Sequence, residues 1–116
     1  MKVLLVEDHT DSRTVLGMLL DRCGCHTVTA KNFAGACARL DEMHFDVLIA
    51  DLGLPDGDGL ELVRYAKERH PLRAIALTAR DSEQEVKIGL QAGFDFYLTK
   101  PVDLHELRLA IGKPAH

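Results

Sequence analysis

Five residues with side chains suited to chemistry stand at or just after the ends of short apolar runs in the 116-residue sequence. They are Glu7, Asp8, Asp51, Thr78 and Lys100. Two unit charges about 4 Å apart repel by roughly 4 kcal/mol at an effective dielectric constant of 20, so clustered carboxylates require a nearby cation. Mg²⁺ is a suitable cation, because it prefers oxygen ligands and is usually held by one or two carboxylates together with phosphate oxygens.

Each residue type in this set suits a separate task in phosphoryl transfer. An aspartate carboxylate can act as a nucleophile and form an acyl phosphate, so Asp51 is a candidate phosphoacceptor. Thr78 can donate a hydrogen bond to one phosphoryl oxygen, while Lys100 places a positive charge near another. Taken singly, each residue also has a structural interpretation: the acids can favour a helix start and Lys100 can be a solvated charge.

The apolar runs predict the strands that bring these residues together. Residues 3–6, 47–50 and 74–77 are continuous apolar runs, as expected of strands buried on both faces of a parallel sheet. Residues 96–98 predict a fourth strand of this kind, and residues 26–30, with two Thr, predict an edge strand. Between them, apolar residues recur at helical spacing in residues 15–20, 33–40, 60–66, 86–90 and 104–111.

Alternation of strand and helix predicts an α/β fold with right-handed crossovers and helices on both faces of a parallel sheet. Ligands bind such open sheets beyond the carboxyl ends of the strands, where the strand order reverses. Gly24 and Gly93 are placed to end the first and fourth helices, and Ser82 with Glu85 has the spacing of a capping box. Residues 53–59 are rich in Gly but lack a phosphate-loop motif, and we interpret them as a turn.

Composition restricts the classes of function. A net charge of -4 is the wrong sign for direct binding to nucleic acid. The sequence has no apolar run long enough to cross a membrane and no signal-type N-terminus, so we expect a single cytoplasmic domain over residues 1–116 without membrane insertion. Cys23, Cys25 and Cys37 lack zinc-type spacing and are expected to be reduced, structural thiols.

Four motifs, in this order, resemble those of response-regulator receiver domains of two-component signalling. They are Val6-Glu7-Asp8, the stretch from Asp51 to Gly59, Leu77-Thr78-Ala79 and Leu98-Thr99-Lys100-Pro101. The resemblance covers essentially the whole chain. It implies a flavodoxin-like, doubly wound (βα)5 fold whose five-stranded parallel sheet has the strand order 2-1-3-4-5.

The resemblance also implies a metal site and a reaction. Asp51 matches the phosphoacceptor, and Glu7 with Asp8 matches the acidic pair that binds Mg²⁺. Gly53 matches the position whose backbone carbonyl completes the metal site. The expected function is Mg²⁺-dependent transfer of a phosphoryl group from a phosphohistidine donor to Asp51, with autodephosphorylation but without the turnover of a conventional enzyme.

Further positions match residues that transmit the signal. Thr78 and Lys100 match the hydroxyl and the lysine that contact the phosphoryl group, and Tyr97 matches the aromatic switch position. Pro101 matches a proline whose preceding peptide bond is typically cis, so we predict a cis Lys100-Pro101 bond. Arg80 stands where many relatives have shorter side chains, which leaves the lifetime of the phosphorylated state open.

The implied partner is a histidine kinase or a histidine phosphotransfer domain, with a downstream protein that the sequence does not identify. The sequences of residues 73–78, 92–94 and 100–104 are most similar to those of receivers in hybrid sensor histidine kinases, so the chain could be part of such a kinase. The alternative is a stand-alone regulator. Two other functions stay open. An aspartyl-phosphate-type phosphatase would carry a second Asp two positions after the nucleophile, where this chain has Gly53, and a docking module would not be phosphorylated.

Overall fold

The chain forms a central parallel sheet with helices on both faces, in a computed structural model that describes residues 1–78 and 83–112. The sheet strands are β1 (Lys2–Val6), β2 (His26–Ala30), β3 (Val47–Asp51), β6 (Arg73–Thr78) and β7 (Phe96–Thr99), in the order β2-β1-β3-β6-β7. This is the predicted 2-1-3-4-5 order of a flavodoxin-like fold. The edge position predicted for residues 26–30 is confirmed.

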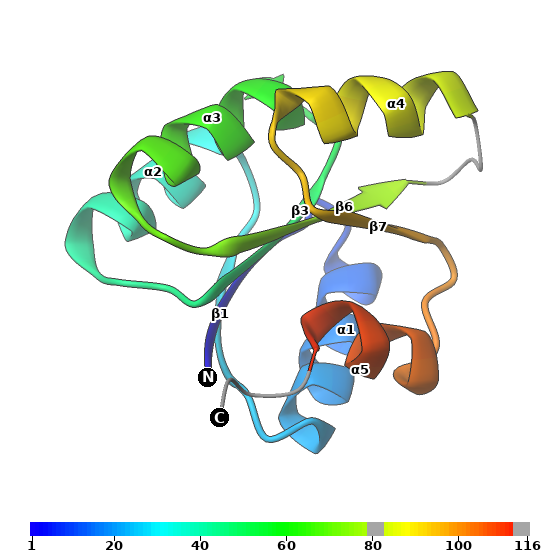
Figure 1. Cartoon of the computed structure of the whole chain (residues 1–116). Coiled ribbons are helices and arrows are strands. Elements are labelled where there is room, and N and C mark those ends of the chain that lie inside the picture. Colours follow the sequence, from blue (N-terminus) through cyan, green and yellow to red (C-terminus); the bar gives the residue numbers. More distant parts are fainter. Residues whose placement is uncertain (79–82, 113–116) are drawn as a thin grey trace.

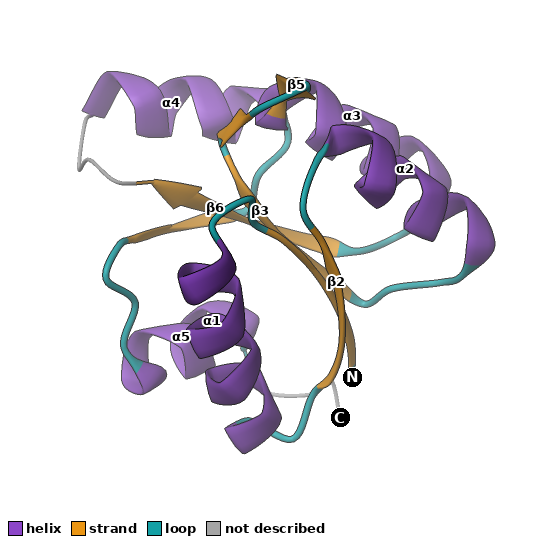
Figure 2. Ribbon diagram, turned by 180° about the vertical axis from the view of Figure 1, so that it is seen from behind, coloured by secondary structure: helices purple, strands orange, loops and turns teal. Residues whose placement is uncertain are grey.

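Helices cover the sheet in two layers (Figure 1). They are α1 (Thr10–Arg22), α2 (Phe33–Glu42), α3 (Gly59–Arg69), α4 (Glu83–Ala92) and α5 (Leu104–Ile111). Helices α1 and α5 lie on one face, and α2, α3 and α4 lie on the other (Figure 2). All neighbouring strands of this sheet are parallel, so their carboxyl ends lie together at one edge.

Two apolar cores, one on each face, explain why the strands are continuous apolar runs. In β1, Leu4 and Val6 belong to the core beneath α2 and α3, whereas Val3 and Leu5 belong to the core beneath α1 and α5. All four are fully buried. Full burial of such a side chain contributes about 1.5–3 kcal/mol relative to its exposure. A shift of register by one residue would exchange the two faces, so the packing fixes the register.

Residues 53–58 are more than a turn, and the prediction of a turn alone is wrong. They form a short antiparallel hairpin of β4 (Gly53–Leu54) and β5 (Gly57–Asp58), in which Gly53 pairs with Asp58. Strands of two residues carry no periodic apolar pattern, so no strand could be predicted there. The hairpin extends from the end of β3 and leads directly into α3.

Most helix ends follow the sequence signals. Gly24 (φ 79°) follows α1 and Gly93 (φ 126°) follows α4, as predicted, and both adopt the positive φ that favours glycine. Asn32, Asp58 and Asp103 cap the N-termini of α2, α3 and α5 through their side chains. The predicted capping box requires Ser82, which falls outside the described part of the chain.

No helix in the described segments is both long and apolar enough to cross a membrane. Cys23, Cys25 and Cys37 are free thiols. Burial raises the pKa of the Cys25 and Cys37 thiols, which disfavours the reactive thiolate.

Candidate functional site

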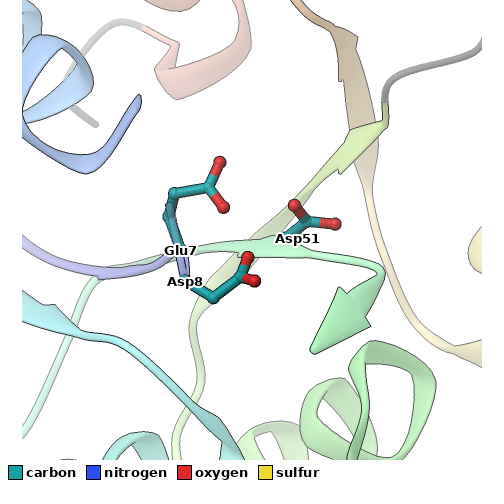
Figure 3. A group of neighbouring side chains, drawn as sticks. All are labelled: Glu7, Asp8 and Asp51. Atoms are coloured by element: carbon teal, nitrogen blue, oxygen red, sulfur yellow. The ribbon is translucent and has the colours of Figure 1, made fainter. Parts of the chain in front are cut away.

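Three carboxylates meet at the carboxyl ends of the two central strands β1 and β3. Val6 pairs with Ala50, so the residues that follow them, Glu7 and Asp51, stand side by side. One carboxylate oxygen from each of Glu7, Asp8 and Asp51 lies within 4.8 Å of the others. Figure 3 shows the three side chains pointing toward a common space. The acidic cluster predicted from the sequence is therefore present.

Lys100 joins this cluster from the end of β7. Its Nζ donates a hydrogen bond to Asp51 Oδ2 at 2.8 Å and a second one to Glu7 Oε1. The Lys100 backbone N–H donates to Thr78 O at 2.8 Å, which fixes the lysine beside the end of β6. The Lys100-Pro101 peptide bond is cis, as predicted.

The charges of Glu7 and Lys100 depend on each other. Burial raises the pKa of Glu7, which is fully buried, and the hydrogen bond and charge of Lys100 oppose that rise only in part. Burial by itself would lower the pKa of Lys100, but hydrogen bonds to Asp51 and Glu7 outweigh it and raise that pKa. Lys100 is thus firmly held as a cation, because it serves two carboxylates at once.

Arg13 is a site residue that the sequence reasoning missed. Its Nη1 donates to Glu7 O at 2.8 Å and to Asp8 O at 3.4 Å, so a side chain of α1 holds the backbone of the acidic pair. The acids do not cap α1, because its N-cap residue is His9. An interaction of Glu7 and Asp8 with the dipole of α1, the structural interpretation of the pair, stays a prediction.

The chain from Asp51 to Gly59 folds back on itself beside the cluster. The Gly53 N–H donates to Asp51 Oδ1 at 3.0 Å, and the Gly59 N–H donates to Leu52 O at 3.1 Å. A Cβ on Gly59 would lie 2.7 Å from Asp51 O, so only glycine fits this approach. The predicted metal-site residue Gly53 lies two positions after Asp51, and the role of its carbonyl as a metal ligand stays a prediction.

Thr78 and Tyr97 lie on neighbouring strands, as predicted. Thr78 is buried at the end of β6, and the β6–β7 register pairs it with Thr99, two residues beyond Tyr97. Tyr97 is 41% exposed. A cavity of about 10 Å³ borders Thr78, Tyr97 and the inner side of α4. Arg80 falls outside the described residues.

Comparison with known proteins agrees with this site. Residues 3–112 match the family described as response regulator receiver domain. The response regulator protein PilR of Pseudomonas aeruginosa is 42% identical over 108 residues, which cover 92% of this chain and 24% of PilR. The chain spans a quarter to a half of the length of several such curated relatives.

Solved structures give the same result. The receiver domain of sensor histidine kinase PA1611 from P. aeruginosa, with a magnesium ion coordinated in its active site cleft, matches with a TM-score of 0.86 and 28% identity over 95% of this chain and 93% of that one. The receiver domain of Ssk1 from Saccharomyces cerevisiae, crystallised with the histidine phosphotransfer protein Ypd1, matches with a TM-score of 0.84 and 30% identity over 92% and 83%. The chain belongs to the response regulator receiver domain family.

Proposed function

We propose that Asp51 is the phosphoacceptor of this receiver domain and that Glu7, Asp8, Thr78 and Lys100 support the transfer. The observation that carries the proposal is the position of Lys100 Nζ, which bonds to Asp51 Oδ2 at 2.8 Å and also to Glu7. A nucleophile, an acidic cluster and a cation thus share one edge of the sheet. Apolar packing does not require that combination.

The donor set fits Mg²⁺. Lys100 offsets one of the three carboxylate charges, and oxygen atoms are the ligands that a hard divalent cation prefers. Glu7, Asp8, Asp51 and the backbone carbonyl of Gly53 would hold the ion. When bound, Mg²⁺ offsets the negative charge that phosphoryl oxygens and carboxylates bring together. The magnesium ion in the similar PA1611 receiver supports this assignment.

Phosphoryl transfer then uses atoms already in place. A carboxylate oxygen of Asp51 attacks phosphorus while the phosphorus–nitrogen bond of the donor phosphohistidine breaks, and the donor imidazole leaves with that electron pair and takes up a proton. An ammonium has three N–H donors, and Lys100 uses two on Asp51 and Glu7, so one can point at a phosphoryl oxygen. Thr78 donates to a second phosphoryl oxygen.

We propose a histidine kinase or a histidine phosphotransfer domain as the phosphoryl donor. The similar Ssk1 receiver was crystallised with such a phosphotransfer protein, which supports this choice. We propose an origin in a hybrid sensor histidine kinase, a proposal that is supported by the similarity of several motifs and by the similar receiver of sensor histidine kinase PA1611. The alternative is a stand-alone regulator, and the curated relatives include response and transcriptional regulators. Residues 1–116 would form one cytoplasmic domain that does not bind nucleic acid directly, in keeping with its net charge of -4.

Intact-mass measurement tests the phosphoacceptor. With a small acyl-phosphate donor and Mg²⁺, the parent chain and Asp58→Asn, an exposed acid of the same loop, should each gain one phosphoryl group. Asp51→Asn should gain none and should keep the parent's circular dichroism spectrum. An equal gain in Asp51→Asn would remove Asp51 from this role. Steady turnover of a chromogenic phosphoester by the parent would instead favour the phosphatase.

A further inference from the structure

The tip of the β4–β5 hairpin is fastened to the start of α2 by Asp56. Asp56 Oδ1 accepts the Phe33 N–H at 2.7 Å, and Oδ2 accepts the Ala34 N–H at 3.1 Å. The first N–H groups of a helix have no partner within the helix, so a carboxylate there makes charge-assisted hydrogen bonds and interacts favourably with the helix dipole. These two bonds also lower the pKa of Asp56, which keeps it ionised.

A packing contact reinforces this attachment. A Cβ on Gly57 would lie 2.6 Å from Cγ of Phe33, so the ring of Phe33 occupies the space that any other residue at position 57 would need. The hairpin tip therefore touches α2 through two hydrogen bonds and one close apolar contact. Helix α2 is itself fixed to the core, where Ala36 and Leu40 are buried.

The other end of the hairpin lies in the functional site. The Gly53 N–H donates to Asp51 Oδ1, and Gly53 pairs with Asp58 across the base of the hairpin. Only Pro55 and Asp56 separate β4 from β5. A displacement of the hairpin tip would therefore be passed on to Gly53, only three residues away. A hairpin of two-residue strands has little stability of its own, and its position depends on what holds its two ends.

We propose that Asp56 is a positioning residue, which holds the Gly53 end of the site in place by anchoring the hairpin to α2 and so sets the affinity for a divalent cation. This inference rests on the proposed function, in which the Gly53 carbonyl is a metal ligand. Groups that orient metal ligands without touching the metal typically change metal affinity by about 10- to 100-fold when removed. The exposed Asp56 should act at the low end of that range.

The experiment compares four variants by calorimetric titration with Mg²⁺. Asp56→Ala removes the anchor, and Asp56→Asn keeps one acceptor oxygen. Asn32→Ala removes the other side-chain cap of α2, a 2.8 Å bond from Gly35 N–H, without touching the hairpin. Asp58→Asn removes one charge from the same hairpin. We expect the Kd for Mg²⁺ to rise about tenfold in Asp56→Ala and less in Asp56→Asn, and to change by less than about twofold in the two controls.

Two further measurements separate positioning from general instability. Because the effect is on affinity, the phosphorylation rate of Asp56→Ala should fall at low Mg²⁺ and approach the parent rate at saturating Mg²⁺. In metal-free protein, the Gly53 amide should exchange its hydrogen faster in Asp56→Ala than in Asn32→Ala. A Kd for Asp56→Ala that matches that of Asn32→Ala overturns the proposal. If the parent binds no Mg²⁺, the metal site of the proposed function is wrong. In that case the Gly53 amide exchange still tests the positioning role of Asp56, and an unchanged exchange rate in Asp56→Ala overturns that role as well.

Discussion

Lys100 Nζ lies 2.8 Å from Asp51 Oδ2, and the same ammonium bonds to the fully buried carboxylate of Glu7. One nitrogen therefore links the end of β7 to Glu7, which follows β1, and to Asp51, which ends β3. The ammonium of Lys100 has two opposing effects on the site. It supplies a donor for phosphoryl oxygens, and it shares the carboxylates that a metal ion would use.

Lys100→Met should separate these two effects. Loss of a positioned donor should lower the rate of Asp51 phosphorylation by about 10²- to 10³-fold at saturating Mg²⁺. The affinity for Mg²⁺ should rise several-fold at pH 8, because no internal cation then competes for Glu7 and Asp51. Calorimetry and intact-mass time courses measure the two effects. Lys87→Met, which alters an exposed lysine of α4, should change neither, and weaker Mg²⁺ binding by Lys100→Met would contradict the argument.

Glu7 should make the stability of the metal-free protein depend on pH. Burial raises its pKa, so the folded chain retains a proton that the unfolded chain releases above the ordinary value of 4.5. This contribution is fully present below pH 4.5 and is lost as the pH rises through the raised pKa. The free energy of unfolding of the parent, relative to Glu7→Gln, should therefore fall as the pH rises above 4.5.

Urea unfolding followed by circular dichroism in the presence of a chelator measures this difference. Glu61→Gln, which neutralises an exposed acid at the start of α3, is the control and should show no such trend. A parent that gains stability over Glu7→Gln as the pH rises would mean that Lys100, and not burial, controls the ionisation of Glu7.

The sheet could be predicted because its strands are buried on both faces, which leaves an apolar run that the sequence displays directly. The adjacency of Glu7 and Asp51 followed from the same argument, since parallel strands end at one edge. The hairpin at residues 53–58 could not be found in this way, because two-residue strands have no period. Its attachment through Asp56 depends on the fold, which brings two segments 22 or more residues apart into contact.

Arg13 was missed for a different reason. Its acceptors are the backbone carbonyls of Glu7 and Asp8, which carry no sequence signal and face Arg13 only once the chain turns from β1 into α1. The second bond of Lys100, to Glu7, was equally hidden. The sequence placed this lysine at the correct edge, but its bonds to both Asp51 and Glu7 depend on side-chain geometry.

The glycines of the loop after Asp51 should differ sharply in their tolerance of a methyl group. A Cβ on Gly59 would lie 2.7 Å from Asp51 O and 2.8 Å from Leu52 Cα, both backbone atoms that cannot move freely. Gly59→Ala should therefore lower the free energy of unfolding by about 1–3 kcal/mol and displace Asp51. Gly53 has open space around its Cα, so Gly53→Ala should stay within about 0.5 kcal/mol of the parent.

Urea unfolding and intact-mass phosphorylation assays test both variants. Gly53→Ala should still be phosphorylated, because the role proposed for position 53 belongs to a backbone carbonyl. Equal losses of stability in Gly53→Ala and Gly59→Ala would show that the close approach of Gly59 to Asp51 is not what constrains this loop.

Thr78 should couple phosphorylation of Asp51 to a movement of Tyr97. Thr78 is buried at the end of β6, and we expect its hydroxyl to move toward a phosphoryl oxygen on Asp51. The cavity of about 10 Å³ beside Thr78 and Tyr97 holds at most about one water molecule. We therefore expect the half-exposed Tyr97 ring to turn inward only when Thr78 vacates space and α4 shifts.

Thr78→Ala should accordingly leave phosphorylation of Asp51 detectable while weakening the response of α4. A shift from 1:99 to 99:1 requires about 5.5 kcal/mol of differential affinity, which charge-assisted bonds from Thr78 and Lys100 to the phosphoryl group supply in large part. NMR with beryllofluoride, which mimics the phosphoryl group, measures the response as shift changes at Tyr97 and in α4. Thr99→Ala, at the position paired with Thr78 on β7, is the control and should respond as the parent does. Shifts at Tyr97 and α4 as large in Thr78→Ala as in the parent would show that the two residues are not coupled through the Thr78 hydroxyl.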